Sequence, residues 1–226
     1  MPRIPVKPRP KVIFKRRPRA TVASLVKKEL YKNAESKHLI NVQTEVQTNG
    51  GTLTSPQTLF DMNNIAEGTE ENQRIGNMIQ PTRLDIRGCL KTNDGRPMYH
   101  KLFLLEFNNQ SNPLLDLLED NNGNYAPAAV DLTAIFARIN TTKYRVLATR
   151  VLKTGQLSST ANDYGSTAMY NINLPITGKM SYLDSLTYAQ KRRIAMVCLS
   201  REAGNDTTSD IMVEVTVNSK FYYKDL

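Results

Sequence analysis

The 226-residue sequence has no tryptophan, two cysteines and two histidines. Two histidines are too few for the histidine-rich metal cup of a cupin-type enzyme, which excludes that class. The sequence also lacks the Gly-x-Ser-x-Gly, Walker, His-Glu-x-x-His and Cys-x-x-Cys spacings, which serve common nucleophilic, nucleotide-binding and zinc sites. The sequence therefore predicts that the protein is not an enzyme and needs no cofactor.

Long apolar runs are absent as well. No segment approaches the roughly 20 residues of a membrane span, and the N-terminal residues contain no apolar stretch of signal-peptide length. We therefore expect a cytosolic or nuclear chain with reduced thiols and no membrane contact. A zinc site would have to combine Cys89, Cys198, His38 and His100, whose scattered spacing instead favours ordinary packed or exposed side chains.

Positive charge is abundant but unevenly placed. Residues 1–37 contain 12 Lys or Arg and two acidic residues, a net charge of +10. The remaining residues contain 18 basic and 19 acidic residues, a net charge of −1. The sequence thus predicts a nearly neutral body, residues 38–226, that carries a cationic arm, residues 1–37. Such an arm is typical of proteins with polyanionic partners.

The arm has two parts. Dense proline and mutual charge repulsion predict an extended, disordered segment through residue 19. Residues 21–34 lack proline and favour a short helix once their charges are neutralised. Nucleic-acid binding, nuclear import and a merely solvated tail all fit the arm. The predicted nucleic-acid-binding residues are Arg3, Lys7, Arg9, Lys11, Lys15, Arg16, Arg17 and Arg19, and Lys15, Arg16, Arg17 and Arg19 also form the candidate import signal.

Apolar residues alternate with polar ones in much of the body, which is the period of a half-buried strand. The alternation occurs at residues 40–46, 84–90, 170–176 and 211–223. Three other segments are more evenly apolar, as strands covered on both faces would be. One further segment suggests a short strand. The evenly apolar segments are 101–107, 142–152 and 193–200, and the short strand is near 57–62.

One stretch, residues 113–140, has helix-like apolar spacing with an interruption. Strand number and the Gly-, Asn- and Pro-rich loops favour an all-β fold. The predicted architecture is an eight-stranded antiparallel jelly-roll sandwich with a disordered basic N-terminal arm.

The Pro- and Arg-rich N-terminal arm and four segments that follow it along the chain resemble, in their order, the single jelly-roll capsid proteins of CRESS-DNA viruses. These are the small circular single-stranded DNA viruses that encode a replication initiator. The most specific piece is NQRIGNMI followed by a strand that ends in IRG. The chain departs from circovirus capsids, whose arms are denser in arginine. The segments are EGTEENQRIGNMIQPTRLDIRG, KYRVLATRVLKTG, NINLPITGKMSY and VEVTVNSKFYYKD.

The resemblance implies a self-assembling icosahedral shell of about sixty copies that packages a single-stranded circular DNA genome through the arm. It also implies location in the virion, and in the host nucleus during assembly, with a nuclear import carrier as partner. A mixed-sign surface that suits subunit contacts is formed by Arg74, Arg83, Asp85 and Arg87 together with Glu70 and Glu71. The alternative is that this loop and strand are stabilised within one subunit, with Gly76 turning a tight corner beside Arg74.

Two other functions stay open. Capsids of small positive-strand RNA viruses share the architecture and the basic arm. A non-viral single-strand nucleic-acid-binding protein would combine aromatic platforms with a cationic arm. The lack of tryptophan, an aromatic content of 7% and the neutral body argue against the non-viral alternative.

Overall fold

The computed structural model divides the chain into two units, Met1–Asn33 and Ala34–Leu226. The extended arm and the basic residues predicted within it, all before residue 22, lie outside the part of the chain that is described. The described residues are 22–49, 57–92, 97–108, 117–119, 125–126, 138–155, 166–183, 186, 189–202 and 212–226.

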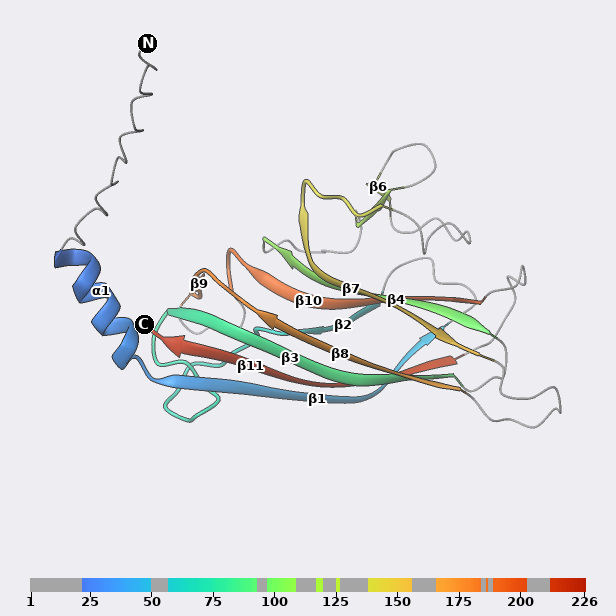
Figure 1. Ribbon diagram of the computed structural model, residues 1–226, viewed down its shortest axis with the longest axis horizontal. Coiled ribbons are helices and arrows are strands. Elements are labelled where there is room, and N and C mark those ends of the chain that lie inside the picture. Colours follow the sequence, from blue (N-terminus) through green and yellow to red (C-terminus); the bar gives the residue numbers. More distant parts are fainter. Residues whose placement is uncertain are drawn as a thin grey trace, which may run out of the picture. The chain divides into compact units, whose positions relative to one another are not determined.

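The first unit contains one described helix, α1 (Val22–Asn33) (Figure 1). It falls in the proline-free part of the arm, where the sequence favours a short helix. A helix of this length is marginal in water without packing or charge neutralisation. None of the described helices is long and apolar enough to cross a membrane.

The second unit is built from eight long antiparallel strands and three strands of two residues each, counted over the described residues (Figure 1). The long strands are β1 (Ser36–Asn49), β2 (Gln57–Asp61), β3 (Met78–Thr92), β4 (Met98–Phe107), β7 (Tyr144–Thr154), β8 (Thr167–Pro175), β10 (Arg193–Glu202) and β11 (Met212–Asp225). The short strands are β5 (Leu118–Glu119), β6 (Tyr125–Ala126) and β9 (Met180–Ser181).

The strands form two main sheets. The first sheet has the order β1-β11-β3-β8, with β9 paired to β3, and the second sheet has the order β2-β10-β4-β7. The chain therefore crosses between sheets at nearly every connection and returns its last strand beside its first. This is the double Greek-key order of a jelly roll, which confirms the predicted fold class.

The two sheets enclose the main core. Leu84 and Ile86 of β3 and Val215 of β11 pack with Leu102 of β4 and Met196 of β10, all with no exposed surface. Alternate residues of β3, β8 and β11 are buried, as the alternation in their sequences predicts. Removal of this apolar surface from water is the main stabilising term of the fold.

A second apolar cluster lies on the opposite side of the second sheet. Phe103 and Leu105 of β4 and Val197 of β10 pack there against Leu117 and Leu118 of the connection between β4 and β7. Burial on both faces confirms the interpretation of residues 101–107 and 193–200. The same interpretation is wrong for residues 142–152, because β7 is an edge strand whose side chains are mostly exposed or half-buried.

The helix predicted from the apolar spacing at residues 113–140 is wrong for the part of this range that the structure describes. Leu118 and Glu119 form strand β5, which pairs with β6, and Leu118 also bridges to Ile139. Burial of Leu117 and Leu118 against the second sheet outweighs their local helical preference. Residues 113–116, 120–124 and 127–137 of that prediction lie outside the described residues.

Strand β1 occurs where it is predicted, but its apolar face is not directed inward. Ile40 and Val42 are 52% and 59% exposed, on the outer face of the first sheet. Lys37, in contrast, is buried. Alternation alone gives the period of a strand and does not say which of its two faces meets the core.

Gly88, which ends the IRG motif, is opposite Tyr170 on β8 and Val217 on β11. A Cβ at this position would be 2.1 Å from the Thr216 backbone oxygen and 2.4 Å from the Tyr170 hydroxyl. Only glycine therefore fits, and the space serves the Tyr170 hydroxyl, which donates a hydrogen bond of 3.2 Å to the Thr216 carbonyl.

Candidate nucleic-acid and subunit interfaces

Arg74, the centre of the NQRIGNMI motif, is completely buried within the subunit. Its guanidinium donates to the carbonyls of Gly76 at 2.7 Å, Leu183 at 3.2 Å and Leu186 at 2.9 Å. It also donates to the side-chain oxygen of Asn77 at 3.0 Å. These bonds fasten the β2–β3 connection to the chain between β9 and β10.

Two further contacts complete the surroundings of Arg74. The Glu67 carboxylate is 3.5 Å from the guanidinium, which also lies 4.7 Å from the centre of the Tyr182 ring. A Cβ on Gly76 would meet only ordinary contact distances, so the arginine, and not the glycine, fixes this corner. Arg74 has no exposed surface in the single chain. Its burial therefore favours the alternative that this loop is stabilised within one subunit.

Lys37, like Arg74, connects segments that are distant in the sequence, at the point where the arm joins the body. Its amine lies 3.2 Å from the Asp225 carboxylate and 3.7 Å from that of Glu35, and it donates to the Gln73 carbonyl at 3.0 Å. The Asp225 carboxylate also accepts from the Ile75 amide at 3.3 Å. Lys37 therefore ties β1 to the chain terminus and the β2–β3 connection, and it is not available to bind phosphate.

Arg83, Asp85 and Arg87 are on the outer face of the first sheet, as the alternation in β3 predicts. Strand register places each of them in a row with residues of the neighbouring strands, most of which are polar. The rows are His38, Tyr222, Arg83 and Pro175; Ile40, Lys220, Asp85 and Asn173; and Val42, Asn218, Arg87 and Asn171.

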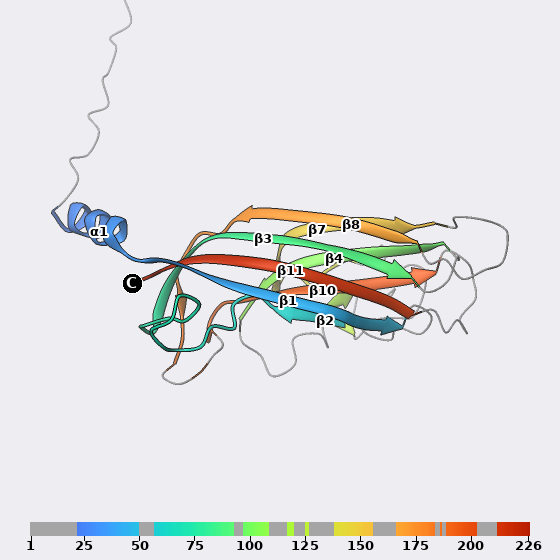
Figure 2. The ribbon, with the colours of Figure 1, turned by 90° about the horizontal axis from the view of Figure 1, so that it is seen from below.

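Figure 2, seen from the side of the first sheet, shows β8, β3, β11 and β1 with no other described strand lying across them. Arg83 and Arg87 are exposed on this face, and Asp85 is half-buried. Arg83 donates to Asp85, and this hydrogen bond raises the pKa of the arginine further. The structure therefore brings three of the four predicted contact residues together; their role in subunit contacts stays a prediction.

Two residues of this face, Tyr222 and Lys220, do not stand out in the sequence analysis. The Arg83 guanidinium is 4.6 Å and the Lys220 amine 5.2 Å from the centre of the Tyr222 ring. The His38 ring centre is 6.2 Å away. The polar half of the alternation in β11 already contains Lys220. Arg83, the other cation at the Tyr222 ring, is on β3, and only the register of β3 with β11 shows that Arg83 and Tyr222 meet.

The four residues considered for a zinc site are separated by the fold. His100 is buried, with its two ring nitrogens 2.9 Å from the hydroxyls of Ser200 and Thr154. Cys198 is in the main core, where burial raises its pKa to about 12, whereas Cys89 and His38 are on the outer face of the first sheet. Over the described residues, no three His, Cys, Asp or Glu side chains are grouped as a metal site would require.

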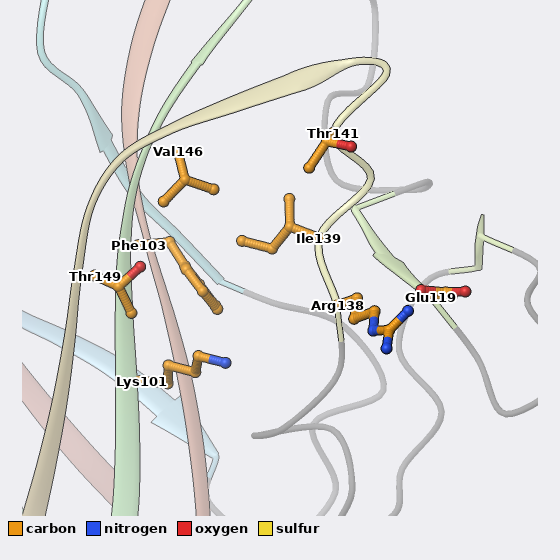
Figure 3. Close-up of a pocket in the computed structure, with 8 residues that line it drawn as sticks. All are labelled: Lys101, Phe103, Glu119, Arg138, Ile139, Thr141, Val146 and Thr149. Carbon is orange, nitrogen blue, oxygen red and sulfur yellow. The ribbon is translucent and has the colours of Figure 1, made fainter.

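A shallow cavity of about 590 Å³ lies between the second sheet and residues 138–141. Figure 3 shows Phe103, Val146 and Ile139 around an apolar centre, with Lys101 and Arg138 at its lower edge. Burial lowers the pKa of Lys101. The described lining includes none of the residues that the sequence predicts to bind nucleic acid or to contact other subunits.

No family model and no curated protein matches the chain. Solved structures similar to it include the T13 viral particle of infectious bursal disease virus (10% identity, TM-score 0.31), its VP2 subviral particle (11%, 0.31) and its Gx strain (10%, 0.28). The alignments cover 85%, 84% and 84% of this chain but only 36%, 37% and 38% of those chains. These TM-scores are too low to carry an argument, so our fold assignment rests on strand order.

Proposed function

We propose that the chain is a viral capsid protein that self-assembles into a small icosahedral shell and packages a single-stranded circular DNA genome through its N-terminal arm. The observation that carries the proposal is the joining of a strongly cationic segment directly to the first strand of an eight-stranded jelly roll, a fold typical of capsid proteins. Jelly rolls also serve as lectins and cupins. A cationic arm of this kind is required for neither.

The charge is sufficient for packaging. The first unit, residues 1–33, contains eleven Lys or Arg and one acidic residue, a net charge of +10, so the arm keeps its full charge although Lys37 belongs to the body. A shell of about sixty copies would then carry on the order of 600 positive charges on its arms. These charges offset a comparable number of phosphates without any base-specific contact.

Arg3, Lys7, Arg9, Lys11, Lys15, Arg16, Arg17 and Arg19 are the residues proposed to bind the genome. Before assembly, the cluster at residues 15–19 acts as the nuclear import signal, because the genome replicates in the host nucleus in the viruses that the sequence resembles. Exchange of Lys15, Arg16, Arg17 and Arg19 for glutamine should then abolish nuclear accumulation and reduce genome packaging, because seven of the eleven Lys and Arg of residues 1–33 remain. Genome packaging and nuclear accumulation can be scored separately in the same cells.

The first test is to purify the full-length chain and examine it by electron microscopy and light scattering, together with the absorbance ratio at the nucleic-acid and protein maxima. Closed particles of uniform diameter that contain nucleic acid support the proposal. Digestion of the extracted nucleic acid by DNase or RNase separates a DNA-virus capsid from an RNA-virus capsid. Small oligomers that bind oligonucleotides reversibly and never form particles would contradict the proposal and favour a non-viral single-strand-binding protein.

A further inference from the structure

We propose that the outer face of the first sheet is a second nucleic-acid contact surface. In this proposal Arg87 and Lys220 bind phosphates of a single strand, and the stacked pair of Arg83 and Tyr222 packs against a base. The inference rests on the proposed function, because it adds a fixed surface on the body to the binding provided by the arm.

The charges on this face are not all equivalent. Arg83 donates to Asp85, Lys91 lies 3.5 Å from Glu214, and the His38 ring nitrogen lies 3.1 Å from the Glu71 carboxylate, so each of these three carboxylates already has a basic neighbour. In contrast, within the described part of the chain, Arg87 and Lys220 have no carboxylate within the 4.0 Å of an ion pair. These two positive charges on adjacent rows are therefore available to phosphates.

The pair of Arg83 and Tyr222 supplies a planar group beside these charges. Guanidinium planes and aromatic rings both stack on unpaired bases, and such stacking tolerates any base. The contacts of the Tyr222 ring with Arg83 and Lys220 hold all three side chains in one arrangement. The Arg83 side chain is 49% exposed, so one side of the pair faces solvent.

The composition of the face favours a nucleic-acid strand over a second protein copy. Stable subunit contacts have an apolar centre and a polar rim. Here the order is reversed: the middle strands β11 and β3 present charged and amide groups, and the exposed apolar side chains Ile40, Val42 and Met169 are on the edge strands β1 and β8. The exposed amides of Asn171, Asn173 and Asn218 can donate to and accept from both backbone and bases.

The position of the arm in the chain strengthens this argument. The arm leads directly into β1, the edge strand of this same sheet. A strand of DNA bound by the arm is consequently tethered to the sheet, which makes weak contacts on the face effective through a high local concentration. Two cations and one stacking pair on the body then suffice to orient the DNA.

The main experiment measures binding of a fluorescent oligothymidylate to the full-length chain over a series of salt concentrations. The variant with both Arg87→Gln and Lys220→Gln should bind on the order of tenfold more weakly near physiological salt. Its slope of log K against log salt should be smaller by about 1.4, because each lost phosphate contact removes about 0.7 for a single strand.

The matched control has Arg150→Gln and Lys153→Gln on β7, both exposed, of which Lys153 also lies 5.5 Å from the centre of an aromatic ring, Tyr99. It removes the same charge from the second sheet and should bind like the parent chain. An equal loss of affinity in both variants would mean that net charge alone is measured, and it would overturn the proposal.

A second variant, Tyr222→Leu, removes the ring and keeps every charge. We expect it to lower the affinity roughly fivefold or more without changing the salt slope, and to reduce ultraviolet cross-linking of the oligonucleotide to the β11 peptide. Circular dichroism checks that the variant is folded. Unchanged affinity and cross-linking would overturn the stacking contact.

These outcomes can be separated from failure of the proposed function. A parent chain that binds no oligonucleotide would overturn both proposals. A parent chain that binds through the arm, while the Arg87→Gln, Lys220→Gln variant binds equally well, would overturn only the present inference. If that variant binds normally but no longer forms particles, the face is a contact between copies of the chain, and the inference is also wrong.

Discussion

The outer faces of the two sheets differ in what covers them. On the second sheet, Phe103, Leu105 and Val197 are buried beneath the connection between β4 and β7. On the first sheet, no described strand lies across the equivalent face, which presents rows of charged and amide groups (Figure 2). The covered face is therefore part of the core and contributes to stability, whereas the open face, with the exposed side chains of Arg83 and Arg87, is the one that we propose to take part in binding.

The same difference can be followed in the strand sequences. β4 and β10 are apolar on both sides, and β3 and β11 alternate. A strand with apolar residues on both sides needs a second covering layer, and here the β4–β7 connection supplies it. A strand that alternates does not need one.

The largest expected effect separates two arginines that the sequence assigns to the same surface. Arg74→Met should lower the free energy of unfolding by about 3–5 kcal/mol, because it removes a fully buried guanidinium together with its hydrogen bonds to three backbone carbonyls. Arg87→Met, on the open face, should change it by less than about 0.5 kcal/mol. Urea unfolding of soluble, unassembled protein measures both. Equal effects would contradict the assignment of Arg74 to the interior.

A matched truncation on the outer side of each sheet tests the comparison directly. Leu105→Ala should cost about 2–5 kcal/mol of unfolding free energy, because the side chain is 1% exposed in the second apolar cluster. Ile40→Ala also shortens an outward-facing aliphatic side chain, but on the open face it should cost less than about 0.5 kcal/mol. If Ile40→Ala costs as much, the open face is packed in solution and our comparison fails.

The second sheet should also be the pH-sensitive one. Burial lowers the pKa of His100 from 6.5 to about 4. Between these two pH values His100 binds a proton in the unfolded chain but not in the folded chain. The contribution of neutral His100 to the free energy of unfolding is therefore fully present above pH 6.5 and is lost as the pH falls towards 4. The total loss should be about 3 kcal/mol.

Urea unfolding at a series of pH values measures this loss. The variant His100→Gln should lack the His100 part of the loss, which distinguishes it from titration of carboxylates. The matched control, His38→Gln, removes the other histidine and should retain the loss. A pH profile of His100→Gln that parallels that of the parent chain would show that His100 is not the cause.

Much of the fold can be predicted from local sequence. The alternation in β3, β8 and β11 predicts the strands, and the alternating apolar residues Leu84, Ile86, Ile172, Val215 and Val217 meet the core shared by the two sheets. Continuous apolar character likewise identifies β4 and β10 as strands covered on both sides. These features depend on the period of a strand and on burial, which the chain encodes locally.

The remaining features depend on contacts between distant segments. The amine of Lys37 pairs with Asp225 at the far end of the chain, which directs the Lys37 side chain inward. Ile40, on the opposite face of the same strand, is exposed as a result. Arg74 is identified by its motif, but its partners Leu183 and Leu186 are more than a hundred residues away. The stack of Arg83 on Tyr222 arises from the register of β3 with β11. No local pattern specifies such pairings.

The smallest expected effect concerns the inner side of the open sheet. Tyr170→Phe removes the hydroxyl that donates to the Thr216 carbonyl through the space left by Gly88. We expect a loss of about 1 kcal/mol of unfolding free energy, the usual net value of a hydrogen bond, with oligonucleotide affinity unchanged. Tyr170 is in the core and not on the outer face, so stability and binding should respond independently here. A Tyr170→Phe variant that kept its stability but lost affinity would show that the two faces of the first sheet are coupled, and it would limit the comparison to the second sheet.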